Sequence, residues 1–128
     1  AAVADFTFAA PAARKVKKET LPAGLEIVRT PDILKELGGR KRPGQILVGF
    51  AAETDAVEAA ARKKLREKNL DLIVANDVSR EGTGFEADVN QAVLIDRRGI
   101  SRKTDILSKR ALAAAIWDAI EGLREKKK

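Results

Sequence analysis

The sequence predicts an α/β fold in three layers, in which helices cover both faces of a mostly parallel sheet. Short apolar runs such as "DLIVAND" (71–77) and "QAVLID" (91–96) are typical of buried strands. Segments with helical periodicity lie between and after such runs, and this alternation favours crossover connections within one sheet. A length of 128 residues fits a single domain.

The first third of the chain predicts a strand end, a hairpin and a short helix. "AAVADF" resembles the end of a buried strand that stops at Asp5, and a loop follows. Apolar and polar residues alternate around a Pro-Ala-Gly turn, which predicts a β-hairpin excursion over about residues 14–29. Thr30 as N-cap and the Pro31-Asp32 pair then predict the start of a helix that Gly38-Gly39 ends.

The remaining elements are predicted from similar signals. A strand is expected over Ile46–Ala51, and Asp55 with Glu58 resembles a capping box for a helix that reaches about Asn69. A long loop over 76–90 and the strand in "QAVLID" follow. A final helix from about Asp105 is expected to have an apolar face made of Ile106, Ala113, Ile116, Trp117, Ile120 and Leu123.

This order of elements predicts where a ligand would bind. In a Rossmann-like sheet, ligands lie beyond the carboxyl ends of the parallel strands. Asp5, Phe50–Glu53 and Asn76-Asp77 follow or end three of the predicted strands. We therefore expect these residues along one rim of the sheet.

Composition restricts the chemistry of such a site. The chain has no cysteine and no histidine, which excludes disulfides, thiolate metal sites and the commonest general base. Nucleic-acid binding is allowed by the net charge of +6, but Lys126–Lys128 supply half of that charge and the few aromatic residues do not interleave with a basic patch. No apolar run in this sequence reaches the roughly 20 residues of a membrane span, and its first residues do not show the basic start, apolar run and cleavage site expected of a secretory signal.

Two lysines occupy an unexpected position on the helix predicted after Asp55. At about 100° per residue, Lys64 and Lys68 fall in the middle of the face defined by Val57, Ala61 and Leu65. A buried ammonium group without a partner costs several kcal/mol. Either these side chains reach past the helix end to water, or they bind an anionic ligand.

Six segments in order, "AAVADF", "KVKK", "VRTPDIL", "VGFAAETD", "LDLIVANDVS" and "GTGFEADVNQAVLI", resemble the bacterial phosphopantothenoylcysteine synthetase domain. The resemblance covers about residues 1–120. It implies a ligase of coenzyme A biosynthesis, in which CTP and 4′-phosphopantothenate form an acyl-cytidylate and cysteine then displaces CMP. In many bacteria this domain follows an FMN-dependent decarboxylase domain in a bifunctional, cytoplasmic enzyme, and no such decarboxylase domain is present in this sequence.

The resemblance also implies site residues. Asp5 is expected near the triphosphate and its Mg²⁺, and Lys15 is the expected catalytic residue, on a loop that closes over the triphosphate. Asn76 is expected near 4′-phosphopantothenate. The remaining positions that match the family's CTP contacts are Pro31, Asp32, Ile33, Leu34, Phe50, Lys64 and Lys68.

The resemblance sets the expected domain organisation as well. Residues 1–123 match the C-terminal portion of the synthetase domain, and 124–128 form a basic tail. Because the sequence begins inside the "AAVAD" motif, the family's glycine-rich phosphate-binding turn, its first strands and an asparagine of the acyl-cytidylate step are expected to be missing, which leaves the activity of these residues alone open. The family forms homodimers. The alternatives are a non-catalytic nucleotide-binding or assembly module of the same fold and a basic nucleic-acid-binding domain.

Overall fold

A computed structural model describes residues 3–17, 24–77 and 89–125 of the chain. The chain divides into two compact units, Ala1–Ile33 and Leu34–Lys128. Among the residues described, no helix is both long and apolar enough to cross a lipid bilayer.

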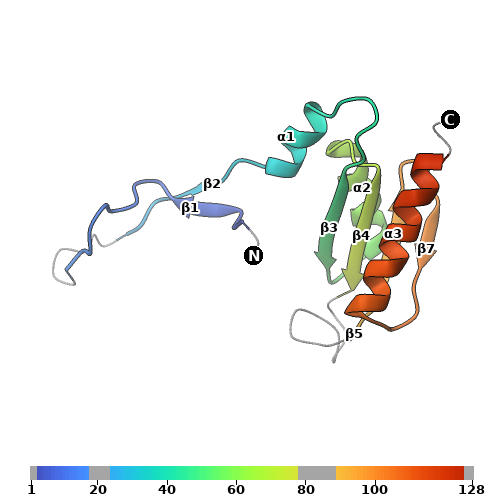
Figure 1. The fold of residues 1–128 in the computed structure, drawn as a ribbon. Helices are drawn as coiled ribbons and strands as arrows, with labels where there is room; N and C mark the ends of the chain where they lie inside the picture. The colour runs from blue at the N-terminus through green and yellow to red at the C-terminus, as the bar shows by residue number, and fades with distance from the viewer. Residues whose placement is uncertain (1–2, 18–23, 78–88, 126–128) are drawn as a thin grey trace. The chain divides into compact units, whose positions relative to one another are not determined.

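The first unit contains an antiparallel ribbon of two short strands, β1 (Phe6–Phe8) and β2 (Ile27–Arg29) (Figure 1). The amide of Thr30 extends the pairing by donating a hydrogen bond to the carbonyl of Asp5, at 2.9 Å. The predicted antiparallel excursion is therefore present, but β2 pairs with residues 6–8 and not with residues near 14. The predicted buried strand ending at Asp5 is wrong, because strand β1 follows Asp5 and its side chains are exposed. Most of the predicted turn lies outside the described residues.

The second unit is built on a four-stranded sheet with the order β3-β4-β6-β7 (Figure 1). These strands are β3 (Val48–Glu53), β4 (Leu72–Asp77), β6 (Ala92–Asp96) and β7 (Ser101–Lys103). The α/β class is confirmed. The prediction of a mostly parallel sheet is wrong: β3 and β4 are parallel, whereas β4–β6 and β6–β7 are antiparallel. A tight turn at Gly99, with φ of 83°, joins β6 to β7, and so short a connection permits only antiparallel pairing.

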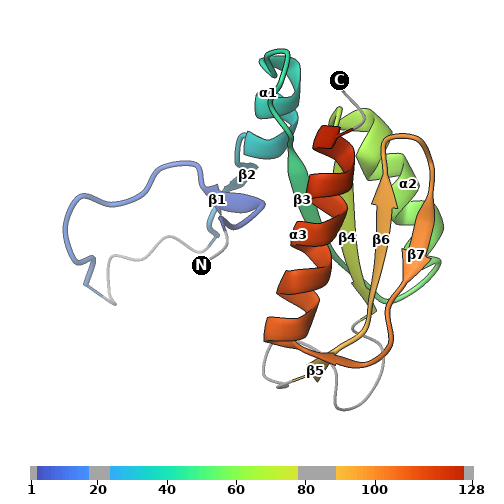
Figure 2. The same cartoon turned by 45° about the vertical axis from the view of Figure 1, so that its right-hand side comes forward.

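Helices cover both faces of this sheet, which confirms the three layers (Figure 2). Helix α2 (Val57–Glu67) packs on one face and helix α3 (Lys109–Glu125) on the other. Alternate residues of β4 divide between the two faces, as strand geometry requires. The α2 face buries Ala51, Ala61, Leu65, Leu70, Ile73, Ala75 and Ile95, and the α3 face buries Leu72, Val74, Ala92, Leu94, Leu112 and Leu123.

The short helix α1 (Ile33–Gly39) ends at the predicted glycine pair. Its predicted N-cap is wrong, because the hydroxyl of Thr30 donates to the carbonyl of Ala4 at 2.6 Å and the helix begins three residues later. The buried Gly38 lies against the backbone at the end of α2, where its carbonyl accepts a hydrogen bond of 2.9 Å from the side-chain amide of Asn69.

The predicted capping box of α2 is also wrong. The helix begins after Ala56, which has φ of 45° and ψ of 41°, and no side chain caps it. Glu58 instead accepts hydrogen bonds from the guanidinium of Arg62, one turn further on, with the shorter at 2.6 Å. The carboxylate therefore stabilises the exposed face of the helix and not its first amides.

Helix α3 begins later than predicted, at Lys109, where the hydroxyl of Ser108 accepts a hydrogen bond from the amide of Ala111. The preceding residues form β7 and the short strand β8 (Leu107–Ser108), which pairs with β5 (Val89–Asn90). The buried side of α3 includes Leu112, Ala115, Ile116, Ile120 and Leu123. Ile106, Ala113 and Trp117 are exposed, and Ile106 precedes the helix, so the prediction that these three belong to its apolar face is wrong.

Replacing Gly38 with alanine is expected to destabilise the protein by about 1–3 kcal/mol, the range for overpacking a close contact. A Cβ atom at this position would lie 1.9 Å from the carbonyl oxygen of Lys68, a backbone atom that can move only with the end of α2. Gly39→Ala is the matched control, because nothing lies within 4 Å of its added Cβ. Urea denaturation measures both variants, and equal midpoints would contradict the close packing of α1 against α2.

Candidate functional site

The carboxyl ends of β3 and β4 lie side by side and form the predicted rim. The register pairs Ala52 with Asn76 and Glu53 with Asp77. Because β6 runs antiparallel to β4, its first residue, Ala92, also reaches this rim opposite Asn76. The rim thus combines two carboxyl strand ends with one amino strand end. It brings together the ends of the segments 50–53 and 76–77, as predicted, whereas Asp5 belongs to the first unit.

Lys64 extends from α2 to this rim and binds the last residue of β3. Its Nζ donates to Oε1 of Glu53 at 2.5 Å. The Lys64 side chain is 43% exposed, whereas the Glu53 side chain is only 16% exposed. Lys64 was predicted to fall in the middle of the buried face of the helix; it is half-buried, and a carboxylate of the same chain supplies its partner.

Lys68 lies at the other end of α2. It follows the last helical residue as the C-cap, and its backbone amide donates to the carbonyl of Lys64 at 3.0 Å. Its carbonyl oxygen faces Gly38 at the end of α1. The residue is half-buried, and its backbone belongs to the end of the sheet where β4 begins. Lys64 is thus paired with a residue of the rim, whereas the backbone of Lys68 lies at the opposite end of the sheet.

Phe50 lies on the opposite face of the sheet from Lys64. Gly49 and Ala51 face α2, as does Glu53, whereas Phe50 and its neighbours Val48 and Ala52 face the side of α3. Its ring is 67% exposed. The edge strand β3 consequently separates the predicted nucleoside contact from the predicted phosphate contact, and a shared ligand would have to pass around the strand end. The predicted contact residue Leu34 packs against the core on the α2 face of the sheet.

Asn76 supplies the clearest unsatisfied group at the rim. Its Oδ1 is buried, and it accepts no hydrogen bond from the residues that the structure describes. A buried acceptor without a donor costs about 1–3 kcal/mol. The position at the carboxyl end of β4 suits a ligand that brings an N–H or O–H group.

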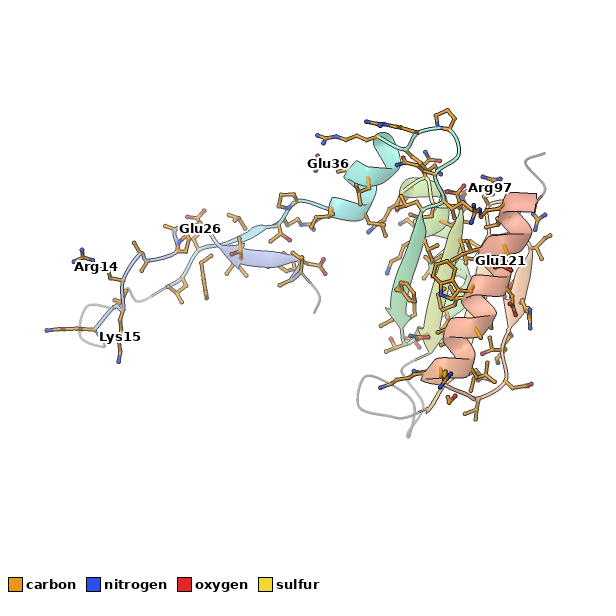
Figure 3. All side chains as sticks on the ribbon, viewed as in Figure 1. Arg14, Lys15, Glu26, Glu36, Arg97 and Glu121 are labelled. Carbon is orange, nitrogen blue, oxygen red and sulfur yellow. The ribbon has the colours of Figure 1, made fainter. Side chains whose placement is uncertain are left out.

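The other predicted site residues belong to the first unit. Asp5 immediately precedes β1, and the side chain of Lys15 projects with that of Arg14 from the loop after β1 (Figure 3). Pro31 and Asp32 lead directly into α1, which begins at Ile33. The five predicted site residues of this unit are all exposed: Asp5, Lys15, Pro31, Asp32 and Ile33. Within the described residues no cluster of three or more acidic side chains could hold a metal ion by itself.

A second charged cluster, at the amino end of β4, was missed by the sequence reasoning. Asp71 is buried, with 1% of its side chain exposed, and its carboxylate binds Lys41 at 3.0 Å and Arg97 at 2.7 Å. The amide of Leu47 donates to the same carboxylate at 2.8 Å. Figure 3 shows Arg97 at this end of the sheet. Desolvation raises the pKa of Asp71, but the hydrogen bonds from Leu47, Lys41 and Arg97 outweigh it and hold the pKa below its usual range.

Asp96 forms a similar site at the turn between β6 and β7. Its Oδ1 accepts hydrogen bonds from the amides of Arg98 and Ile100, at 2.9 and 3.0 Å, and the guanidinium of Arg98 binds Oδ2. Burial raises the pKa of Asp96, but these bonds lower it by more. The carboxylate of Asp71 stabilises the start of β4, and that of Asp96 stabilises the turn between β6 and β7. Both lie at the end of β4 opposite to the carboxyl rim.

The stability of the protein is therefore expected to be almost constant between pH 8 and 5 and to fall steeply below about pH 4. Asp71 and Asp96 have lowered pKa values when folded, so their contribution is complete above the ordinary value of 3.8 and is lost as protons bind at lower pH. The chain has no histidine that could titrate near neutrality. Urea midpoints from pH 8 to 2 test this, with Asp96→Asn expected to flatten the acid limb; a fall in stability between pH 7 and 5 would contradict it.

Sequence and structure comparisons extend this description. Residues 1–123 match the family described as DNA/pantothenate metabolism flavoprotein C-terminal domain. The coenzyme A biosynthesis bifunctional protein CoaBC of Bacillus subtilis is 51% identical over 123 residues, which are 96% of this chain and 30% of that protein. A cysteine/cysteine sulfinic acid decarboxylase from an unknown prokaryotic organism is 40% identical, over 91% of this chain and 32% of that protein.

A solved structure shares the fold. The crystal structure of the C-terminal domain of a CoaBC protein superposes with a TM-score of 0.68 and 41% identity, covering 80% of this chain and 46% of the other. The chain thus spans about a third of the length of these curated relatives and less than half of the solved domain.

Proposed function

The chain belongs to the DNA/pantothenate metabolism flavoprotein C-terminal domain family, and from this membership we propose that it takes part in coenzyme A biosynthesis as a CTP-dependent ligase. The reaction joins 4′-phosphopantothenate to cysteine. The observation that carries the proposal is Lys64, a half-exposed ammonium group held at the carboxyl rim of the sheet. Ligands of open α/β sheets bind beyond the carboxyl ends of parallel strands, which here are β3 and β4, and lysine binds phosphate as a point charge.

The proposed chemistry has two steps. The carboxylate of 4′-phosphopantothenate attacks the α-phosphorus of CTP, the bond to the pyrophosphate oxygen breaks, and an acyl-cytidylate forms. The amine of cysteine then attacks the acyl carbon, CMP leaves, and the nitrogen loses a proton. Neither step needs a side-chain nucleophile, which suits a chain without cysteine or histidine.

The residues of this chain would act by position and charge. Lys64 would stabilise the negative charge that moves onto pyrophosphate, and Phe50 would contact the nucleoside. Lys15 and Lys68 stay predicted CTP contacts that rest on the family resemblance. The turn over residues 31–34 would bind the nucleotide, and Asn76 Oδ1 would accept a hydrogen bond from 4′-phosphopantothenate. Asp5 would hold Mg²⁺ jointly with the triphosphate, since Mg²⁺ is usually bound by one or two carboxylates together with substrate phosphates and would neutralise part of their charge.

A homodimer and a cytoplasmic location are part of the proposal. The ribbon of β1 and β2 has only two strands, and such a ribbon is marginally stable by itself. Its strands carry exposed apolar side chains, among them Phe6, Phe8 and Ile27. A second copy of the chain would cover them. Sedimentation of the full-length gene product would contradict the dimer if it showed only monomers at micromolar concentration.

Millimolar CTP with Mg²⁺ is expected to raise the melting temperature of the full-length gene product by about 2–4 °C at roughly ten times Kd. ATP at the same concentration is the control for base recognition. An unchanged melting temperature at every CTP concentration would contradict the proposal. Saturable CTP binding without pyrophosphate release in the presence of 4′-phosphopantothenate would instead indicate a non-catalytic nucleotide-binding module.

A further inference from the structure

Glu53 is a partly buried acidic residue in a site that is proposed to bind a polyanion. Its carboxylate is 16% exposed and binds Lys64 at 2.5 Å. No other hydrogen bond to this carboxylate comes from the residues that the structure describes. A carboxylate so close to a phosphate site would weaken phosphate binding, unless it serves the lysine that it holds.

The geometry shows how the pair could serve a ligand without separating. A lysine ammonium group has three N–H donors, and Glu53 takes one of them. If Lys64 left to bind a phosphate, it would leave a largely buried carboxylate without a partner, which is strongly unfavourable. Lys64 therefore meets an incoming phosphate while it remains bound to Glu53, and its other donors are the ones that the ligand can use.

We propose that Glu53 is a positioning residue for Lys64 and sets the charge of the phosphate site, an inference that rests on the proposed function. By fixing the ammonium group at the rim, Glu53 removes the entropy cost of ordering a long side chain when the nucleotide binds. By adding a negative charge, it makes the pair neutral overall. The site therefore favours the Mg²⁺ complex of the nucleotide over the metal-free nucleotide, which carries more negative charge.

Two variants separate these effects in the full-length gene product. Glu53→Gln keeps an acceptor for Lys64 but removes the charge, so metal-free CTP is expected to bind about fivefold more tightly and MgCTP nearly as before. Glu53→Ala also removes the acceptor, so its affinity for MgCTP is expected to be about threefold to tenfold lower than that of Glu53→Gln. Glu67→Gln is the matched control, because Glu67 pairs only loosely with Lys63, at 3.8 Å on the exposed side of α2.

A second measurement tests positioning without any nucleotide. In protein labelled with ¹⁵N-lysine, the NMR signal of the Lys64 ammonium group is identified by its loss in Lys64→Arg. The ion pair with Glu53 is expected to slow the exchange of the ammonium hydrogens with water, which makes this signal observable. It is expected to persist in Glu53→Gln and to broaden in Glu53→Ala. A Lys64 signal that is the same in the wild type and Glu53→Ala would overturn the positioning role.

The affinities measured for CTP distinguish the role of Glu53 from the proposed function. If wild-type protein binds MgCTP and both Glu53 variants bind metal-free CTP and MgCTP as the wild type does, the role of Glu53 is overturned and the proposed function stands. If the wild type does not bind CTP at millimolar concentration, the proposed function fails, and the inference fails with it. A fivefold change in the ratio of metal-free to MgCTP affinity in Glu53→Gln, absent in Glu67→Gln, would support the inference.

Discussion

Replacing Lys64 with alanine is expected to lower kcat/KM for CTP by about 10- to 100-fold. A hydrogen bond from an ammonium group to a phosphate contributes about 1.5–3 kcal/mol, and each 1.4 kcal/mol is a factor of ten. Lys64 reaches the carboxyl rim of the sheet, and its position there is fixed by the 2.5 Å bond to Glu53. Steady-state kinetics of the full-length gene product with CTP as the varied substrate measure the effect.

The neighbouring Lys63 supplies the control for this variant. Its side chain is 71% exposed and contacts Glu67 at 3.8 Å, so Lys63→Ala is expected to keep the kinetics of the wild type. Because Lys64→Ala also leaves Glu53 without a partner, its melting temperature has to be measured alongside. Equal loss of activity in both variants, or none in either, would contradict a phosphate contact at Lys64.

Replacing Asp71 with asparagine is expected to destabilise the protein by about 3–5 kcal/mol, the range for breaking a buried ion pair. The carboxylate joins Lys41, Arg97 and the amide of Leu47 at the point where the chain enters β4. Asparagine keeps one acceptor but leaves both cations without a counter-charge. Urea denaturation at pH 7 measures the change in the free energy of unfolding.

Glu36→Gln is the matched control for the Asp71 variant. Glu36 binds Arg40 at 2.7 Å, but both side chains are at least half exposed, so its removal is expected to cost less than about 1 kcal/mol. A similar cost for the two substitutions would contradict the structural role of Asp71.

The sequence predicted the elements whose signal is local. The apolar runs became β3, β4 and β6, and the glycine pair ended α1 where expected. The periodicity placed Lys64 and Lys68 in the middle of the buried face; both residues are half-buried, and Lys68 follows the last residue of α2.

Features set by tertiary contacts could not be predicted in this way. The sheet was expected to be mostly parallel, but the antiparallel pairing of β6 with β4 and of β7 with β6 depends on tertiary contacts and on the turn at Gly99. Asp55 has the spacing of a capping box, yet Ala56 in a left-handed conformation begins α2. Glu53 was noted at the rim, but a single strand-end glutamate does not reveal which lysine it will bind.

The central claim is tested most directly by the first half-reaction. The full-length gene product is incubated with MgCTP and 4′-phosphopantothenate in the absence of cysteine, and the quenched mixture is analysed by mass spectrometry. We expect the acyl-cytidylate and an equal amount of pyrophosphate, with CMP and the cysteine adduct appearing once cysteine is added. CTP that binds but yields neither the acyl-cytidylate nor pyrophosphate would contradict the claim that this site forms an acyl-cytidylate.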